Sequence, residues 1–312
     1  MAKYRIGIVG LGKITEDRHV PVIRGNDAFD LVAVASQRGL TVEGVQHAFR
    51  DWRDLIAKTP DLDAVIVCTP PQVRTAIALA ALDAGKHVML EKPPTATMSE
   101  LAALRASAER AGLTLFTTWH SQYNAAVADA ARRLAGKTVA SLRINWKEDV
   151  RHWHPGQQWI WAPGGFGVFD PGINALSIVT RIMPQPVFVR SAELFFPENR
   201  ATPIAANIAF SSSLATDDWS AEFDWRQTGE QTWDILIATA DGAKLALRKG
   251  GSRLEVDGRL AVEAKPREYE MIYQRFAELL GNRASEVHED PLRLVADAFM
   301  AGRRTVVEPF VD

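Results

Sequence analysis

A lysine, an aspartate and an asparagine have the chemistry and spacing needed to move a proton at a bound hydroxyl group. Lys92 follows Glu91 in the stretch EKPP, where a short apolar run ends. Asp170 and Asn174 are four residues apart, so in a helix they lie one turn apart on the same face. An ammonium and a carboxylate can act as general acid and base, whereas a neutral amide only exchanges hydrogen bonds. We predict that Lys92 and Asp170 form a coupled acid-base pair, with either group able to take the proton, and that Asn174 orients the ligand.

The first 120 residues contain the elements that would position Lys92. Continuous apolar segments typical of buried strands alternate with helical segments that end in glycine. This alternation predicts a parallel sheet that is covered by helices on both faces. The predicted strands are 4–10, 31–37, 63–70, 87–93 and 113–119, and the predicted helices are 73–85 and 97–112.

The second part of the chain has longer strands with partly alternating polar residues, which are typical of an open, mainly antiparallel sheet. Asp241-Gly242 is suited to a hairpin turn between two of them. We therefore predict an α/β protein with an N-terminal Rossmann domain (1–120) and a C-terminal α/β domain (121–312). The predicted strands are 140–149, 187–196, 207–212, 219–227, 233–242 and 243–251, and the helices that could cover one face are 170–183, 267–281 and 290–304.

A glycine-rich turn follows the first predicted strand. In GIVGLGKIT, Gly10 permits a tight turn and Gly12 lets the backbone approach a pyrophosphate at a helix N-terminus. Thr15 stands where the pattern usually has a third glycine, which loosens the match. Because the turn follows a strand inside a repeated strand-helix pattern, we predict a dinucleotide site here.

The end of the second predicted strand bears on which dinucleotide binds. An NAD-specific site usually has an acidic residue here for the ribose 2′-hydroxyl, but this strand ends Ser36-Gln37-Arg38. A hydroxyl followed by a guanidinium suits a 2′-phosphate, because arginine makes charge-assisted hydrogen bonds and stacks on adenine. We predict that NADP is preferred and NAD accepted. The alternative is that Arg38 is a solvated turn residue.

The composition narrows the class of protein. The 36 Lys and Arg against 38 Asp and Glu give a formal net charge of -2, which favours neither nucleic acid nor a membrane surface as a partner. No apolar segment approaches the roughly 18 residues of a membrane span. A single cysteine, Cys68, excludes an intramolecular disulfide framework and a cysteine-rich zinc site, so we expect a cytoplasmic protein.

Four motifs carry a resemblance to a known family: GLGKI, CTPPQV (68–73), EKPP (91–94) and GVFDPGIN (167–174). They resemble the glucose-fructose oxidoreductase, inositol dehydrogenase and rhizopine-catabolism (Gfo/Idh/MocA) family along essentially the whole chain. The resemblance implies a Rossmann domain followed by an α/β domain whose open sheet often forms an oligomer interface, so a homodimer is possible. It also implies that Lys92 projects into the catalytic cleft, commonly across a cis peptide to Pro93. The predicted cofactor contacts are Gly10, Gly12, Lys13, Ile14, Ser36, Gln37, Arg38, Cys68, Thr69, Pro70, Glu91 and Lys92.

A narrower resemblance concerns the substrate. TTWHSQYN, WKEDVRHWHPGQQWIW and FDPGINALSIVTRI are similar to the bacterial sugar 1-dehydrogenases of this family, which oxidise L-arabinose, D-galactose or D-fucose at the anomeric carbon with NAD(P). Many family members have a histidine base where this chain has Asn174, and an amide cannot replace it as a base. The predicted sugar contacts are His120, Glu148, Trp153, His154, Asn174 and Trp233, the last of these mainly by resemblance.

The sequence also allows a metal site and two other functions to be considered. His152 and His154 would share one face of a strand and could suggest a metal, but hydride transfer to nicotinamide needs none, and we predict no metal. An inositol-type dehydrogenase acting on a ring hydroxyl is one alternative, although Asn174 in place of histidine disfavours it. A non-catalytic sugar- or NADP-sensing regulator is another, because a fold does not fix a function. Retention of both Lys92 and Asp170 argues against the regulator.

Overall fold

The computed structural model describes residues 3–212 and 218–311, and the chain divides into two compact units. Unit 1 comprises Met1–Trp119 and Tyr269–Glu289, and unit 2 comprises His120–Glu268 and Asp290–Asp312. The segment Tyr269–Glu289 therefore belongs with the N-terminal part of the chain, whereas the sequence predicts a single boundary at residue 120.

Unit 1 is built on a six-stranded parallel sheet with the order β3-β2-β1-β4-β5-β6, which confirms the predicted Rossmann topology. All five predicted strands are present, and the additional strand β3 has only three residues. The strand order reverses between β1 and β4, which is the point where doubly wound sheets bind nucleotides at the carboxyl ends of their strands. The strands are β1 (Tyr4–Val9), β2 (Phe29–Ala35), β3 (His47–Phe49), β4 (Ala64–Val67), β5 (His87–Glu91) and β6 (Leu115–Thr118).

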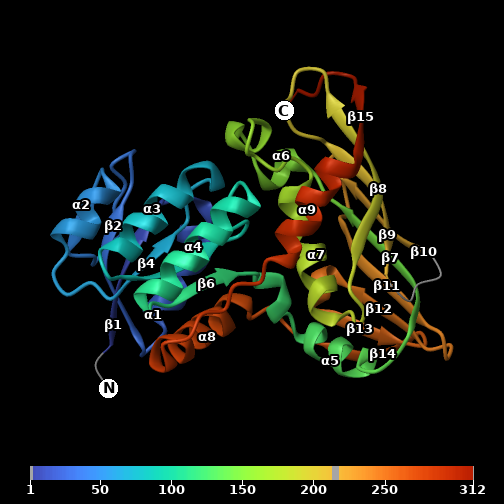
Figure 1. Cartoon of the computed structure of the whole chain (residues 1–312), viewed down its shortest axis with the longest axis horizontal. Coiled ribbons are helices and arrows are strands. Elements are labelled where there is room, and N and C mark those ends of the chain that lie inside the picture. Colours follow the sequence, from blue (N-terminus) through green and yellow to red (C-terminus); the bar gives the residue numbers. More distant parts are fainter. Residues whose placement is uncertain (1–2, 213–217, 312) are drawn as a thin grey trace. The chain divides into compact units, whose positions relative to one another are not determined.

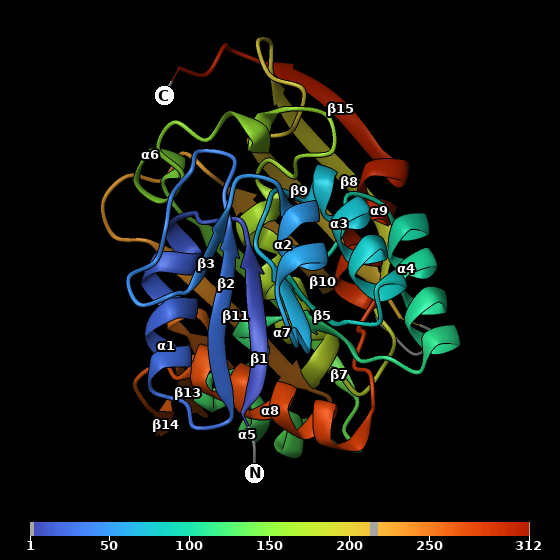
Figure 2. The same ribbon diagram turned by 90° about the vertical axis from the view of Figure 1, so that its left-hand side faces the viewer.

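Helices cover both faces of this sheet (Figure 2). The face that carries Val65 and Leu90 packs against apolar residues of three helices, among them Leu55, Ile77 and Leu104, in one buried cluster. The helix that begins after Thr97 has a capping box formed by Thr97 and Glu100. It ends at Gly112 in the left-handed conformation, as the sequence predicts. The helical elements of the N-terminal segment are η1 (Thr15–His19), α1 (Val20–Arg24), α2 (Trp52–Lys58), α3 (Pro71–Asp83) and α4 (Met98–Ala111).

The helix α8 (Glu268–Asn282) packs on the opposite face of the unit 1 sheet. The sequence-based assignment of this helix to the second sheet is wrong. The ring of Phe276 stacks against Phe29 of β2 and Phe116 of β6, with centroids 5.8 and 6.0 Å apart. Tyr273 packs edge-on against Phe29 at 5.4 Å. An apolar helical stripe shows that a helix needs a sheet to cover, but not which sheet, so the sequence pattern could not decide between them.

Unit 2 contains a nine-stranded sheet with the order β14-β13-β12-β11-β7-β10-β9-β8-β15. Only the pairs β10–β7 and β15–β8 are parallel among the pairs described, so the prediction of a mainly antiparallel sheet is confirmed. The Asp241-Gly242 hairpin joins β11 and β12, with Gly242 at φ +93°. The strands are β7 (Val139–Lys147), β8 (Phe188–Pro197), β9 (Ala205–Ser211), β10 (Asp218–Asp224), β11 (Thr232–Thr239), β12 (Lys244–Arg248), β13 (Arg253–Val256), β14 (Arg259–Glu263) and β15 (Gly302–Val307).

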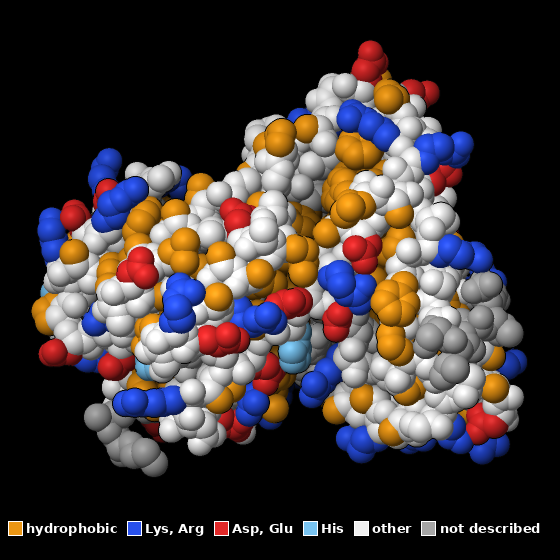
Figure 3. Space-filling view, viewed as in Figure 1, with side chains coloured by type: hydrophobic (Ala, Val, Ile, Leu, Met, Phe, Trp, Pro, Cys, Tyr) orange, Lys and Arg blue, Asp and Glu red, His pale blue; other side chains and the backbone are white. Residues whose placement is uncertain are grey.

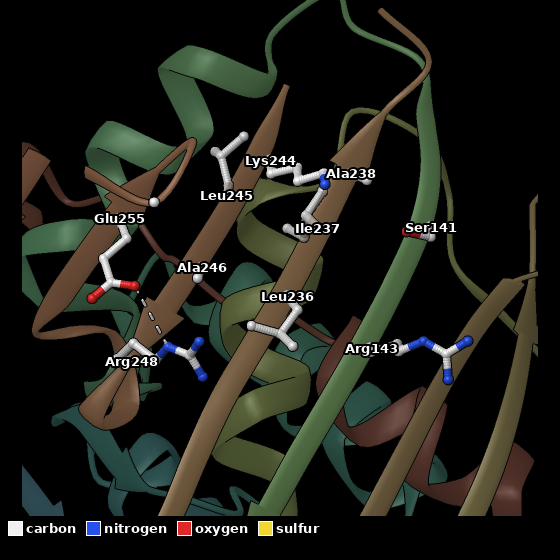
Figure 4. Close-up of a pocket in the computed structure, with 11 residues that line it drawn as sticks. Ser141, Arg143, Leu236, Ile237, Ala238, Lys244, Leu245, Ala246, Arg248 and Glu255 are labelled. Carbon is white, nitrogen blue, oxygen red and sulfur yellow. Dashed lines mark ion pairs between the residues drawn. The ribbon is translucent and has the colours of Figure 1, made fainter. Parts of the chain in front are cut away.

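The longer helices of unit 2 lie on one face of its sheet (Figure 1). Buried side chains alternate with half-buried or exposed ones along β7, β11 and β12, as expected when only one sheet face is covered. The other face carries a shallow pocket of about 320 Å³, lined by Arg143, Leu236, Arg248 and their neighbours (Figure 4). The helical elements are η2 (His120–Tyr123), α5 (Ala125–Leu134), α6 (Val150–Trp153), η3 (Gln158–Trp161), α7 (Phe169–Ile182), η4 (Lys249–Gly251) and α9 (Asp290–Ala301).

The charges on the visible surface are mixed. Figure 3 shows acidic and basic side chains interspersed on the face that it presents. None of the helices within residues 3–212 and 218–311 is long and apolar enough to span a bilayer.

Candidate active site

The glycine-rich turn of unit 1 has the geometry of a nucleotide cradle. Gly10 has φ +100°, and a Cβ added to it would lie 2.9 Å from the backbone of Cys68 and of Thr69, so no other residue fits. A Cβ on Gly12 would meet no atom of the described residues within 4 Å. The first glycine is therefore required by the fold itself, whereas the second leaves open space beside the backbone. Both features fit a pyrophosphate that approaches this turn.

Thr15 explains the departure from the usual third glycine. Its hydroxyl donates a hydrogen bond to the carbonyl of Gly10 at 2.8 Å, and its backbone N–H donates to the carbonyl of Gly12 at 3.0 Å. Thr15 is fully buried. The side chain thus fixes the turn from inside, which a glycine at this position could not do.

Two guanidinium groups lie near the end of β2. Arg38 donates to the carbonyl of Leu11 at 2.7 Å, so its side chain reaches the glycine-rich turn. The guanidinium of Arg50 lies 3.1 Å from where a Cβ on Gly39 would be. Arg50 was not predicted as a site residue, because it follows β3, a strand too short to stand out in the sequence. Ser36 is buried, its N–H donates to Phe49 at 2.9 Å, and Gln37 is exposed.

The remaining predicted cofactor residues described here lie near the carboxyl ends of strands in the same sheet. Cys68, Thr69 and Pro70 follow β4 and are half-buried, and the backbone of the first two contacts the Gly10 position. Ile14 is half-buried at the start of η1. Lys13 is exposed and pairs with Asp17 at 2.5 Å, so in this structure its ammonium lies on the helix surface.

Lys92 leaves the end of β5 through a tightly held turn. The Lys92–Pro93 peptide is cis, as the family resemblance implies. The buried guanidinium of Arg74 donates to the carbonyls of Glu91 and Pro93, on either side of Lys92, and to Thr69 at 2.7 Å. The backbone of Lys92 donates to the Glu91 carboxylate at 2.9 Å. The turn is therefore fixed by a buried cation from α3 and by its own glutamate.

The first two turns of α7 carry Asp170 and Asn174 in unit 2. Gly172 lies between them and faces β10, since a Cβ there would come within 2.9 Å of the Phe223 ring. Two residues correspond to about 200° around a helix, so Asp170 and Asn174 share the side away from that contact. Asp170 is 1% exposed and Asn174 is half-buried. The close approach of the helix to the sheet thus orients both polar side chains.

His154 is an ionisable neighbour of Asp170. Its Nε2 lies 3.2 Å from the Asp170 carboxylate, and its Nδ1 lies 3.3 Å from Gln157 Oε1. The imidazole also packs edge-on against Trp225 at 5.2 Å. A carboxylate and an imidazole in hydrogen-bond range can share a proton, so the structure brings two of the predicted site residues together.

Glu148 organises the tryptophans of unit 2. Its buried carboxylate accepts hydrogen bonds from the indole N–H of Trp225 at 3.2 Å and of Trp233 at 2.8 Å. Trp233 also packs against Trp153, whose ring centroid is 5.7 Å away and whose side chain is exposed. Trp225 is fully buried and was not predicted. Trp225 continues the apolar alternation of Trp219, Ala221 and Phe223, so the sequence pattern indicates a core position and gives no sign of its hydrogen bond to Glu148.

His120 lies where the chain enters unit 2. Its Nδ1 is 3.1 Å from the Glu268 carboxylate, which also accepts from the Asn124 amide at 2.9 Å. Glu268 is the residue after which the chain first leaves unit 2, so this contact joins two of the three points at which the backbone passes between the units. His120 is therefore well fixed, with a ring that is only partly accessible.

The described part of the chain has no cluster of three or more His, Cys, Asp or Glu residues able to hold a metal ion.

Unit 1, with its glycine turn at the switch point of a parallel sheet, defines a dinucleotide-binding oxidoreductase fold. Residues 4–118 match the model of the Gfo/Idh/MocA oxidoreductase family with an NAD-binding Rossmann fold. Full-length similarity to the relatives described next extends this match, and the chain belongs to that family.

Two relatives match the chain from end to end. It is 48% identical over 312 residues to a galactose 1-dehydrogenase of Pseudomonas fluorescens, covering 100% of both chains. A crystal structure of D-galactose-1-dehydrogenase from Rhizobium etli is 52% identical, with a TM-score of 0.94 over 100% of this chain and 99% of that one. A 3-ketoreductase from Actinomadura kijaniata, solved with NADP and TDP-benzene, shares the fold at 19% identity, with a TM-score of 0.84 over 98% of this chain and 100% of that one.

Proposed function

We propose that this chain is an aldose 1-dehydrogenase that oxidises C1 of a pyranose to the aldonolactone and transfers hydride to NADP or NAD. The observation that carries the proposal is the buried Asp170 carboxylate beside His154, with Asn174 one turn further along α7. Oxidation of an anomeric hydroxyl needs a group that removes its proton as the C1 hydride leaves. Full-length identity of 48% to a galactose 1-dehydrogenase supports the same reaction.

The protein side chains must take up the proton of the C1 hydroxyl and orient the sugar. Bound nicotinamide supplies the hydride acceptor. Lys92 and Asp170 are the coupled acid-base pair of this proposal, and either group can take the proton of the C1 hydroxyl. Asn174 donates and accepts hydrogen bonds at neighbouring sugar hydroxyls. Near-normal turnover of Lys92→Ala with unchanged cofactor affinity would exclude this assignment.

The aromatic and histidine residues of unit 2 supply the remaining sugar contacts. Exposed Trp153 offers an apolar ring face to sugar C–H groups, and Trp233 packs beside it. His154 and His120 donate hydrogen bonds to hydroxyls. The contacts of Glu148 with two indoles support a different task from direct sugar binding, because its carboxylate orients Trp233.

The substrate class follows from ring stereochemistry. L-Arabinose, D-galactose and D-fucose have the same configuration from C1 to C4 and differ only in the substituent at C5. A pocket that grips the shared hydroxyls accepts all three sugars, so we expect turnover of each.

The cofactor proposal is NADP in preference to NAD. Arg38 and Arg50 both bring guanidinium groups to the edge at which β2 ends. The 2′-phosphate gives NADP about two more negative charges than NAD. Guanidinium groups bind phosphate with paired, charge-assisted hydrogen bonds. Ser36 and Gln37 follow β2 directly and complete the proposed contact with the ribose.

The open sheet face of unit 2 is the proposed homodimer surface. Its pocket combines Leu236 with charged residues that include Arg143 and Glu255 (Figure 4), a mixture suited to self-complementary pairing about a two-fold axis. Light scattering coupled to size-exclusion chromatography should give twice the chain mass, and Leu236→Asp should return the protein to a monomer. A cytoplasmic location suits the single cysteine.

A spectrophotometric screen tests the function. NADPH and NADH formation is followed with the three named aldoses, with D-glucose and with myo- and scyllo-inositol. The proposal predicts turnover of the galactose-configured aldoses and faster reaction with NADP. Turnover confined to inositols would instead indicate a ring-hydroxyl dehydrogenase, and sugar binding without turnover would indicate a sensing protein.

A further inference from the structure

A buried polar network lies behind the Lys92 turn in unit 1. The Glu91 carboxylate accepts hydrogen bonds from the Tyr269 hydroxyl at 2.8 Å and from the backbone N–H of Lys92 at 2.9 Å, and it lies 3.0 Å from His19 Nε2. His19 Nδ1 is in turn 2.8 Å from the Tyr273 hydroxyl. The side chains of His19 and Glu91 are 0% and 4% exposed.

The alternation of β5 explains how Glu91 comes to be buried there. Val88 and Leu90 face the cluster formed with α3 and α4, so Glu91, like Met89, faces the opposite side of the sheet. That side is the one against which α8 packs. A carboxylate at the end of a buried strand therefore points at the tyrosines of a helix that is remote in sequence.

The network joins three separate parts of unit 1. His19 ends η1, which begins directly after the glycine-rich turn, and Glu91 ends β5. Tyr269 and Tyr273 come from α8. A buried charge is costly unless it is paired and hydrogen-bonded, so a cluster of this kind at the carboxyl edge of the sheet calls for a reason beyond packing.

We propose that His19 and Tyr269 are positioning residues for Lys92. Both residues bind the Glu91 carboxylate, which accepts a hydrogen bond from the backbone N–H of Lys92. The network thereby fixes the backbone that carries the Lys92 side chain. The proposal rests on the role of Lys92 in the proposed function. The tyrosine hydroxyl fixes one oxygen of the carboxylate from α8, and the imidazole fixes the same oxygen from η1.

The charge state of His19 strengthens this arrangement. Burial alone would lower the pKa of His19, but its interactions with Cys68, Tyr273 and Glu91 raise that pKa well above its usual value. Burial also raises the pKa of Tyr273, which stays protonated. The groups that face His19 are thus Glu91, Cys68, Tyr269 and Tyr273, and an imidazolium beside the Glu91 carboxylate keeps the buried charge balanced.

Three variants test the proposal in the full chain. Tyr269→Phe removes one hydroxyl that binds Glu91, and His19→Gln removes the positive charge but keeps a hydrogen-bonding side chain. Tyr4→Phe is the matched control, since Tyr4 is a half-buried tyrosine of the same unit outside the network. We expect kcat to fall about 10- to 100-fold in the first two variants, because small displacements of a catalytic group have effects of this size. KM for the sugar and Kd for NADP should stay within about two-fold.

Two further readouts separate positioning from loss of fold. Hydrogen exchange at the Lys92 amide should be faster in Tyr269→Phe and in His19→Gln than in wild type and Tyr4→Phe, while most other β5 amides stay protected. The pH at which activity rises should move upward in His19→Gln, because the Glu91 charge is then uncompensated. Adding Glu91→Gln to that variant should restore the wild-type midpoint.

Unchanged Lys92 exchange or unchanged kcat in folded Tyr269→Phe would overturn the proposal, even if His19→Gln fails to fold. Exchange at Lys92 needs no substrate. If no aldose is oxidised, the proposed function fails, and the exchange result still decides whether the network holds the Lys92 backbone.

Discussion

The Nε2 atom of His154 lies 3.2 Å from the carboxylate of Asp170, on the first turn of α7 in unit 2. Asp170 is buried, whereas His154 retains partial access to solvent. A buried carboxylate therefore has a route for its proton to an imidazole that can exchange it with water.

Asp170→Asn should reduce kcat by about 10²- to 10⁴-fold, the usual contribution of a positioned acid or base. The amide has the same shape, so the protein should fold and bind NADP normally. Asp297→Asn, a partly exposed residue of α9 paired with Arg293, is the control and should keep wild-type turnover. Steady-state kinetics with D-galactose compare the two variants with wild type. If Asp170→Asn kept more than a tenth of the wild-type kcat, Asp170 would not be a catalytic acid or base.

Arg38→Ala and Arg50→Ala should each raise KM for NADP about 10-fold, because a hydrogen bond to a charged group contributes about 1.5–3 kcal/mol and solvent screens exposed sites. KM for NAD should change little, since NAD lacks the 2′-phosphate. Arg53→Ala removes a guanidinium that stacks on Trp52 in the same unit and serves as the control. Equal losses with NADP and NAD would mean that these arginines bind something other than the 2′-phosphate.

Gly10→Ala and Gly12→Ala should fail in different ways. A Cβ on Gly10 would collide with the backbone of Cys68 and Thr69, and φ +100° alone disfavours alanine, so we expect a loss of about 1–3 kcal/mol in stability. Gly12→Ala should keep its stability within about 0.5 kcal/mol, because its Cβ meets no described atom, but should bind NADP more weakly. Urea unfolding and fluorescence titration with NADPH separate the two effects. A stable Gly10→Ala would contradict the described turn.

The His19–Glu91 pair should make stability depend on pH. The folded protein raises the pKa of His19, so the stability that this proton contributes is fully present below about pH 6.5, the unfolded value, and is lost as pH rises through the folded pKa. The Tm of wild type should therefore exceed that of His19→Gln/Glu91→Gln most at low pH, with a difference that shrinks as pH rises. Calorimetry over a pH series measures this. A difference that grows with pH would mean that His19 is neutral in the folded protein.

Much of unit 1 follows from local sequence. Continuous apolar runs predict its five longer strands, and the capping box at Thr97 and Gly112 mark the two ends of α4. The turn at Asp241-Gly242 likewise fixes a hairpin in unit 2. In each case, the physical cause lies within a few neighbouring residues, so the sequence pattern contains it.

Long-range partners could not be predicted in this way. The apolar stripe of α8 would suit either sheet, and only tertiary packing against Phe29 and Phe116 assigns it to unit 1. Similarly, the contact between Glu91 and Tyr269 joins residues 178 positions apart. Glu148 has suitable chemistry for a sugar contact, but its hydrogen bonds to two indoles depend on strand register, which the sequence does not display.

Transfer of the C1 hydrogen is the central claim, and isotope tracing tests it most directly. D-Galactose carrying deuterium at C1 is incubated with the enzyme and NADP, and the reduced cofactor is examined by mass spectrometry and proton NMR. The account predicts that deuterium appears at nicotinamide C4 and that turnover is slower with the labelled sugar if hydride transfer limits the rate. Reduced cofactor without deuterium would contradict oxidation at C1.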